Sequence, residues 1–176
     1  ATALREWKPL AEHGDASAQH NLGFMYYNGQ GVSQDYEIAV KWYTLAGEQG
    51  IASAQHNLGF MYYNGQGVSQ DYETAVKWYT LAGEQGHASA QNNLGWMYRK
   101  GEGVPQDYKI AVKWWTLAAE QGDASAQRNL GTMYRKGDGV EKNYKTAMKW
   151  YTLAAEQGYA DAQNNLGVMY YKGQGI

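Results

Sequence analysis

The sequence contains no cysteine, only two prolines and almost no net charge. The lack of cysteine excludes disulfides and thiol chemistry, and it leaves the cellular compartment open. Fifteen basic and 17 acidic residues sum to −2 at pH 7, so no strong field attracts nucleic acid or an anionic membrane surface. Aromatic residues make up 14% of the chain, which is enough to build a core rather than remain disordered.

The sequence also lacks membrane and targeting signals. No uninterrupted apolar run approaches the roughly 20 residues that a membrane helix needs. No charged segment followed by an apolar one stands at the start, as a secretory leader would require. The first residue is Ala1 rather than Met, which we expect of a processed or trimmed product. The sequence therefore predicts no membrane insertion.

What the chain does contain is a repeat of 36 residues, seen as the step from position 15 to position 51. The block Asp15–Gly50 recurs as Ile51–Gly86, with changes only at positions 15/51 and 38/74. This near-identity fits either a recent duplication or an engineered consensus. A fixed period of this size is the signature of stacked repeats. We predict one array over residues 1–176, divided into 1–14 (a lone second helix), 15–50, 51–86, 87–122, 123–158 and 159–176 (a partial fifth repeat).

Each repeat predicts two helices joined by a glycine-containing turn. Apolar residues at helical spacing place the first helix of the first copy at about Ala16–Asn28. The second helix, at about Gln34–Gln49, is apolar on two sides and should be buried on two sides. Short links between helices require antiparallel neighbours. The predicted fold class is all-α, a solenoid of antiparallel helix pairs with about ten helices.

Residues at special positions refine these helices. Gly23, inside the first helix, indicates close packing under a large ring of the neighbouring helix. Pro9 is expected to kink the opening helix or to move its start. Ser33 or Asp35 favours the start of the second helix, as Pro105 does in the third copy. Asp15 and Asp123 can cap their first helices, whereas the equivalent residues in the other copies cannot: Ile51, His87 and Tyr159.

The pattern A-x-x-x-L-G-x-x-Y-x-x-G-x-G-V, followed by D-Y-x-x-A-x-x-W-Y-x-L-A-x-E-Q-G, resembles the Sel1-like repeat, a relative of the tetratricopeptide repeat. The resemblance covers essentially the whole chain, although paired cysteines of some members are missing. It implies a right-handed α/α superhelix with a concave surface, and a role as scaffold or adaptor in proteins that are often bacterial and often exported. A periplasmic or secreted location is the expectation, with the cytoplasm as the alternative. In the first copy the pattern is carried by Ala18, Leu22, Gly23, Tyr26, Gly29, Gly31, Val32, Asp35, Ala39, Trp42, Tyr43, Ala46, Glu48 and Gly50.

No residue pattern points to catalysis, a metal or a cofactor. His20 and His56 are equivalent positions in adjacent copies, but no third ligand follows the pattern, so solvated histidines are preferred over a zinc site. Ser33 and Ser69 recur as cap residues with no base at hydrogen-bonding spacing. The Gly29–Gly31 stretch follows no strand and precedes no Gly-Lys-Ser/Thr, which argues against a phosphate loop. We predict a non-enzymatic protein without cofactor or metal.

Binding is better supported, on the face of the first helix opposite its core. In tetratricopeptide-like stacks this face lines the concave groove. Core positions hardly vary between copies, whereas this face does: Phe24 becomes Phe60, Trp96, Thr132 and Val168. The alternative is that solvated positions simply drift, against which stand the large exposed aromatics. The predicted partner-binding residues are His20, Asn21, Phe24, Tyr27, His56, Asn57, Phe60, Tyr63, Asn93, Trp96, Arg99, Lys100, Arg128, Asn129, Arg135 and Lys136.

The predicted surface is graded, aromatic in its first half and cationic in its second. We predict a protein or peptide ligand with an apolar part on the first half. An acidic segment or terminal carboxylate would meet the arginines of the second half, because arginine favours bidentate carboxylate geometry. The asparagine that recurs from Asn21 to Asn165 either holds the ligand, as the resemblance implies for related repeats, or bonds to a neighbouring helix or solvent.

Two rival functions remain. The chain begins with a second helix and ends with a first helix, so Tyr159–Lys172 of one molecule could stack on Thr2–His13 of another and complete a repeat. A truncated chain, whose missing residues cover those faces, is the alternative. The other rival is saccharide binding on the aromatic face, because aromatic rings stack on sugars.

Overall fold

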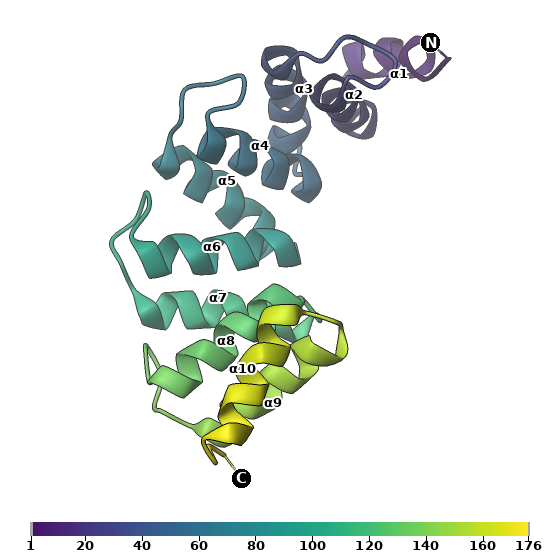
Figure 1. Cartoon of the computed structure of the whole chain (residues 1–176). Helices are drawn as coiled ribbons and strands as arrows, with labels where there is room; N and C mark the ends of the chain where they lie inside the picture. The colour runs from purple at the N-terminus through teal and green to yellow at the C-terminus, as the bar shows by residue number, and fades with distance from the viewer. Residues whose placement is uncertain (1, 176) are drawn as a thin grey trace. The chain divides into compact units, whose positions relative to one another are not determined.

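The computed structural model describes the backbone of residues 2–175 and the side chains of residues 3–175. Within that range it contains helices and turns and no strand (Figure 1). The predicted all-α class is confirmed, and so is the helix number for these residues. The ten helices are α1 (Thr2–Glu12), α2 (Ala16–Asn28), α3 (Tyr36–Glu48), α4 (Ala52–Asn64), α5 (Tyr72–Glu84), α6 (Ala88–Lys100), α7 (Tyr108–Glu120), α8 (Ala124–Lys136), α9 (Tyr144–Glu156) and α10 (Ala160–Tyr171).

The first helix of the first repeat, α2, has a polar cap at one end and a glycine at the other. The Asp15 carboxylate accepts a hydrogen bond from the backbone N–H of Ala18 at 2.7 Å, which satisfies one of the free donors of the first turn. Gly29 follows the helix with φ at 68°, a left-handed conformation that glycine adopts without strain. The predicted limits of this helix are confirmed.

The second helices are shorter than predicted. In the first repeat, α3 begins at Tyr36 because the Asp35 side chain accepts a hydrogen bond from the N–H of Ile38 at 2.9 Å. Gln34 lies outside the helix and donates its side-chain amide to the carbonyl of Tyr27 at 2.9 Å. Of the two candidate caps, Asp35 is therefore the one used. In the third repeat Asp107 caps α7, so the predicted start at Pro105 is wrong.

Two further expectations about helix ends are corrected. Pro9 lies inside α1 and does not move its start, which is at Thr2, so of the two alternatives only a kink stays a prediction. His87 does act as a cap, because its Nδ1 accepts a hydrogen bond from the N–H of Ala90 at 3.4 Å. An imidazole can take this role when the accepting nitrogen is unprotonated.

The chain divides into two compact units, residues 1–90 (unit 1) and residues 91–176 (unit 2). In unit 1, α1 packs on α2, α2 on α3, α3 on α4 and α4 on α5. In unit 2, α7 packs on α8, α8 on α9 and α9 on α10. Within each unit, these helices pack on their neighbours in sequence, as short links between antiparallel helices require. One continuous array over residues 1–176 stays a prediction.

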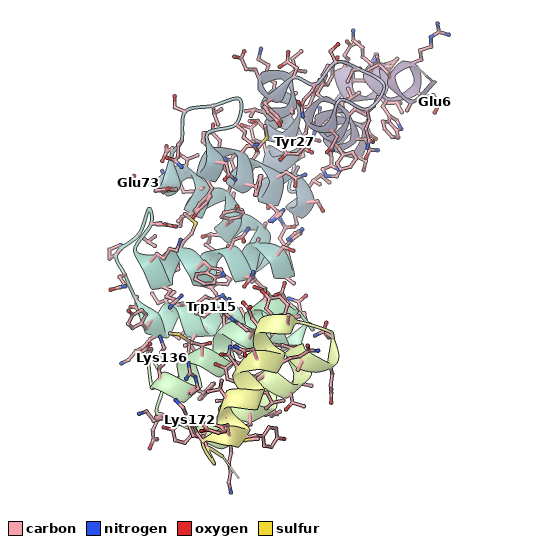
Figure 2. All side chains as sticks on the ribbon, viewed as in Figure 1. Glu6, Tyr27, Glu73, Trp115, Lys136 and Lys172 are labelled. Atoms are coloured by element: carbon pink, nitrogen blue, oxygen red, sulfur yellow. The ribbon has the colours of Figure 1, made fainter. Side chains whose placement is uncertain are left out.

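A large ring covers the glycine inside the first helix of most repeats. A Cβ added to Gly23 would lie 2.5 Å from the ring of Tyr43, and one added to Gly59 would lie 2.6 Å from the ring of Tyr79. Trp115, labelled in Figure 2, covers the equivalent glycine of α6. The predicted close packing is confirmed for the pairs Gly23–Tyr43, Gly59–Tyr79, Gly95–Trp115 and Gly131–Tyr151.

Candidate functional site

A pocket in unit 1 lies between the equivalent first helices α2 and α4, with α3 behind them. Its volume is about 380 Å³. The helices α2 and α4 contact each other, so one face of each contributes to the same wall. Most of the lining comes from the face that the sequence predicted to bind. The lining residues are His20, Phe24, Tyr27, Asn28, Tyr43, Asn57 and Phe60.

Two exposed phenylalanines occupy the same repeat position on these two helices. Phe24 is 45% exposed and Phe60 is 39% exposed. Both line the pocket, so these two exposed rings lie at one place. Burying such area stabilises a complex by about 25 cal/mol for each Å² removed from water. The pair of phenylalanines is therefore an apolar contact point on the first helices of unit 1.

The inner wall of the pocket is formed by His20, Tyr43 and Asn57. The rings of His20 and Tyr43 lie 5.7 Å apart between centroids, and a side-chain hydrogen bond joins Tyr43 to Asn57. Burial lowers the pKa of His20 and raises the pKa of Tyr43, because removal of water disfavours the charged form of each group. The wall is therefore uncharged at neutral pH.

Tyr27, labelled in Figure 2, is held by the next repeat. Its hydroxyl donates to the Gln66 side-chain oxygen at 3.2 Å, and its ring lies 5.3 Å from that of Tyr36. Burial, with a smaller effect of Tyr36, raises the pKa of Tyr27. The fixed ring gives the pocket a preformed side, which reduces the entropy lost on binding.

The predicted residues of the second repeat are also partly held within unit 1. The ring of Tyr63 packs on Tyr72 at 5.1 Å, as Tyr27 packs on Tyr36. His56 stacks on His87, with ring centroids 4.6 Å apart. Burial, followed by the proximity of His87, lowers the pKa of His56 to about 4. This pair is neutral at physiological pH and contributes no charge to the surface.

In unit 2, the first cationic residues gather around Trp96. The guanidinium of Arg99 lies 5.1 Å above the Trp96 ring, and the ammonium of Lys100 lies 5.9 Å from it. Lys100 also approaches the Glu102 carboxylate at 3.4 Å. Trp96 itself meets Trp115 edge-to-face at 5.6 Å. The indole thus orients both cations, since a cation is attracted to the face of the ring.

The remaining arginines differ in how far they are engaged. Arg128 donates to Asn129 Oδ1 at 3.0 Å and to the Asp161 carboxylate at 3.2 Å. Arg135 has no such ion pair in the described part of unit 2, and the buried Nε atoms of Arg128 and Arg135 both lack a hydrogen-bond partner there. Lys136, labelled in Figure 2 at the end of α8, is exposed. Arg135 is therefore the arginine of α8 with the most capacity for an added acceptor.

The asparagine positions correct the sequence prediction in part. Asn129 is only 3% exposed and is bonded to Arg128, so its amide is not accessible to a partner. Asn57 bonds to Tyr43, which favours the alternative of a bond to the neighbouring helix. Asn21 and Asn93 are half-buried. Their role in binding stays a prediction.

Two lining residues, Asn28 and Tyr43, were not among the predicted binding residues. Tyr43 had the position of a core residue, and its side chain is buried, yet one edge forms the pocket wall. Gly23 could have predicted the role of Tyr43. A ring that lies over a helix glycine also lies close to the exposed face of that helix.

Other site types find no support in the described residues. Over residues 2–175, histidine and acidic side chains do not gather in groups of three or more that could hold a metal ion. In the same range, every helix is too short or too polar to cross a membrane.

Comparison with known families gives a match over nearly the whole chain. A family model described as Sel1 repeat matches five consecutive segments, each starting one residue after the predicted repeat boundary. No curated protein sequence matches closely enough to count as a relative. The matched segments are residues 16–51, 52–87, 88–123, 124–159 and 160–176.

Solved structures give the same result. The protective antigen c5321 of uropathogenic Escherichia coli, described as having an SLR fold, is 46% identical with a TM-score of 0.95, over 98% of this chain and 37% of that one. A Sel1 repeat protein from Oxalobacter formigenes is 41% identical with a TM-score of 0.89, over 93% of this chain and 68% of that one. An immunity protein from Pseudomonas aeruginosa, 24% identical with a TM-score of 0.55 over 90% of this chain and 59% of that one, is similar in fold alone.

These matches bear on the fold and on the extent of the chain. The predicted class, a solenoid of helix pairs, is confirmed. The chain spans little more than a third of the length of the E. coli antigen.

Proposed function

Because this chain belongs to the Sel1 repeat family, whose fold generally serves as a non-catalytic scaffold for protein–protein interaction, we propose that it binds a peptide segment or tail of a partner protein on its first-helix face. The anchor point is the unit 1 pocket, at which the partner buries apolar side chains against Phe24 and Phe60. No enzymatic activity is part of this function.

The observation that carries the proposal is the exposed phenylalanine pair at a preformed pocket. Both rings are more than a third exposed, and both belong to the lining of the same pocket. Their neighbours Tyr27 and Tyr43 are fixed by contacts within unit 1. Apolar anchors filling a rigid pocket typically dominate the energy of an interface.

A second contact of the same partner is proposed for unit 2. Arg99 and Arg135 occupy equivalent positions on α6 and α8, and neither forms an ion pair with another described residue of unit 2. An acidic segment or terminal carboxylate supplies the missing acceptors. Arg128 has a smaller part in this contact, because Asn129 and Asp161 already engage it.

The experiment is affinity selection from a random peptide library, followed by calorimetry with the selected peptides. The variant F24A/F60A removes the two exposed rings of the first helices. The control variant L45A/L81A removes two leucines of similar exposure, 43% and 45%, from equivalent positions on α3 and α5. We expect the first variant to weaken binding at least about tenfold, since hot-spot truncations cost about 2 kcal/mol or more.

The control variant should leave the affinity within about twofold of the original chain. Equal losses in both variants would show that the phenylalanines have no special role. A library that yields no binding peptide, while an oligosaccharide array does, would favour saccharide binding over the proposed function.

Self-association is a second candidate, because one face of α10 is open. The same face of the other first helices is covered by a ring of the following second helix. Gly167 has no ring over it, whereas Gly23 lies under Tyr43. Tyr171, equivalent to the half-buried Tyr27, is 91% exposed. Covering this face with α1 of a second molecule would place Trp7 at the position of Tyr43. Light scattering over a concentration series tests this contact: a constant mass of 19.7 kDa contradicts it, and a mass that rises with concentration in the original chain but not in Y170K/Y171K supports it.

A further inference from the structure

The chemistry of the unit 1 pocket restricts what can occupy it, and this argument rests on the peptide-binding function proposed above. The lining contains no Asp, Glu, Lys or Arg, the His20 imidazole is neutral at physiological pH, and the hydroxyls of Tyr27 and Tyr43 stay protonated there. A charged group that entered would lose its hydration without meeting a counter-charge, which is costly. An uncharged occupant is therefore favoured.

The polar groups of the lining are already engaged. Tyr27 donates to Gln66 at 3.2 Å, and Tyr43 is bonded to Asn57. The Asn28 amide donates to the backbone carbonyl of Phe24 at 3.0 Å. A saccharide needs many hydrogen-bond partners, and these groups offer it only the capacity that their existing bonds leave. An apolar ring needs none of them.

The size and shape of the pocket fit a single large side chain. Its volume of about 380 Å³ is near the lower end of the roughly 300–1,000 Å³ that small-molecule sites occupy. Aromatic rings line it from both first helices, with Phe24 on one and Phe60 on the other. Aromatic groups favour offset or edge-to-face contact with such rings.

We infer that this pocket receives an uncharged aromatic side chain of the partner, and that protonation of His20 releases it. The imidazole forms part of the wall, so an occupant excludes water from it and no acidic side chain replaces that water. Binding thus favours the neutral imidazole. The two equilibria are linked. Because binding of the occupant lowers the affinity of His20 for a proton, protonation of His20 lowers the affinity for the occupant by the same factor.

Among the groups that surround His20 in the pocket, His20 is the one that changes charge in mild acid. Asn21 on α2 bonds to it, Tyr43 of α3 lies 5.7 Å away, and Asn57 and Phe60 of α4 share the lining. No residue of α1 belongs to the lining. Burial raises the pKa of both Tyr27 and Tyr43, so these hydroxyls stay protonated while His20 changes charge.

The test uses N-acetyl-tryptophanamide as a neutral aromatic probe, with indole-3-acetate as its anionic counterpart. Amide resonances of the whole chain are recorded by NMR during titration with each probe at about pH 7.5 and about pH 5. The neutral probe should shift resonances of α2 and α4 around Phe24 and Phe60, with an affinity at least about threefold weaker at the lower pH. Indole-3-acetate should not shift these resonances at the higher pH.

Two variants separate release by His20 from general acid effects. H20N introduces asparagine, which the sequence already has at the same repeat position in the third and fifth copies, as Asn92 and Asn164. This variant should bind the neutral probe with the same affinity at both pH values. H13N, which changes an exposed histidine outside the pocket, should retain the pH dependence. Unchanged protein resonances without probe at the lower pH confirm that the fold is intact.

The outcomes distinguish this inference from the proposed function. If selected peptides bind through Phe24 and Phe60 but the neutral probe does not reach the pocket, the aromatic occupant is wrong and the peptide function stands. If the probe binds equally at both pH values, or if H20N keeps the full pH dependence, release by His20 is wrong. If no peptide binds, the proposed function itself is wrong.

Discussion

The side-chain amide of Gln85 donates a hydrogen bond to the side-chain oxygen of Gln55 at 2.7 Å. Gln55 is only 4% exposed, and its own amide donates to the backbone carbonyl of Gly47 at 2.9 Å. One glutamine thus joins three consecutive helices, α3, α4 and α5. The same pair recurs as Gln49–Gln19, Gln121–Gln91 and Gln157–Gln127, at 2.7 to 2.9 Å.

This glutamine contact predicts the first stability difference. Replacing Gln55 by leucine removes its hydrogen bonds to the Gly47 carbonyl and to Gln85, which should lower the free energy of unfolding by about 1–3 kcal/mol, at about 0.5–1.5 kcal/mol for each bond. Gln163 is the matched control, because it occupies the same position on α10 but is exposed. Urea denaturation of Q55L and Q163L measures the two effects. Equal losses would mean that burial of the glutamine does not matter.

The ring–glycine contact predicts opposite effects at two equivalent positions. G59A should destabilise the chain by about 1–3 kcal/mol, because the new Cβ would overlap the Tyr79 ring and the core must shift. G167A meets nothing within 4 Å, so the better helix propensity of alanine should stabilise it by about 0.5–1 kcal/mol. Thermal unfolding followed by circular dichroism compares them. A destabilised G167A would contradict the open face of α10.

The stacked histidines predict loss of stability in acid. The pKa of His56 is lowered to about 4 by burial and by His87, whereas an unfolded histidine titrates near 6.5. Between these values the unfolded state binds more protons, so the free energy of unfolding rises with pH. The stabilisation is complete above about pH 6.5 and is lost as pH falls toward 4, by an amount on the order of 3 kcal/mol.

A single substitution should reduce this acid effect. H87D introduces the residue found at the equivalent cap positions Asp15 and Asp123, each of which accepts a backbone hydrogen bond. It should add about 1 kcal/mol at neutral pH through a better cap, and place a carboxylate beside His56 that favours its protonated form. Urea denaturation between about pH 4.5 and 7.5 measures both. An unchanged pH slope would show that His87 is not responsible.

The cationic residues of unit 2 predict binding of acidic peptide that depends on salt. A labelled hexaglutamate peptide should bind R99A/R135A at least about threefold more weakly than the original chain, since two unpaired guanidiniums are removed. K109A/K113A is the control, because it removes two exposed lysines from the second helix α7. Fluorescence anisotropy at low and high salt measures the difference, which should shrink as salt screens the charges. The same loss in both variants would indicate only a general effect of net charge.

The parts of this structure that the sequence predicts depend on local, repeated signals. The step of 36 residues gives the helix pairs, and Gly23 predicts the ring of Tyr43 because a buried helix glycine needs a large neighbour. Asp35 identifies a helix start through its own side chain. These features recur for the same reason in the four complete copies, so repetition makes them easy to recognise.

The parts that the sequence does not predict depend on contacts between distant residues. Asn129 has the same repeat position as the half-buried Asn57, but the neighbouring Arg128 bonds to it and Asp161 holds that arginine from the next repeat. His87 accepts a backbone hydrogen bond that the preferences of capping residues do not anticipate. Neither outcome follows from residue type alone, because each depends on how side chains of adjacent repeats are placed.

The most direct test of the central claim is an amide chemical-shift map of the chain bound to a selected peptide. The account predicts that the largest changes fall on α2 and α4, around Phe24, Asn28 and Phe60, and that F24A/F60A abolishes them. Changes concentrated instead on the second helices α3 and α5, around Leu45 and Leu81, with the first-helix resonances unaltered, would contradict it.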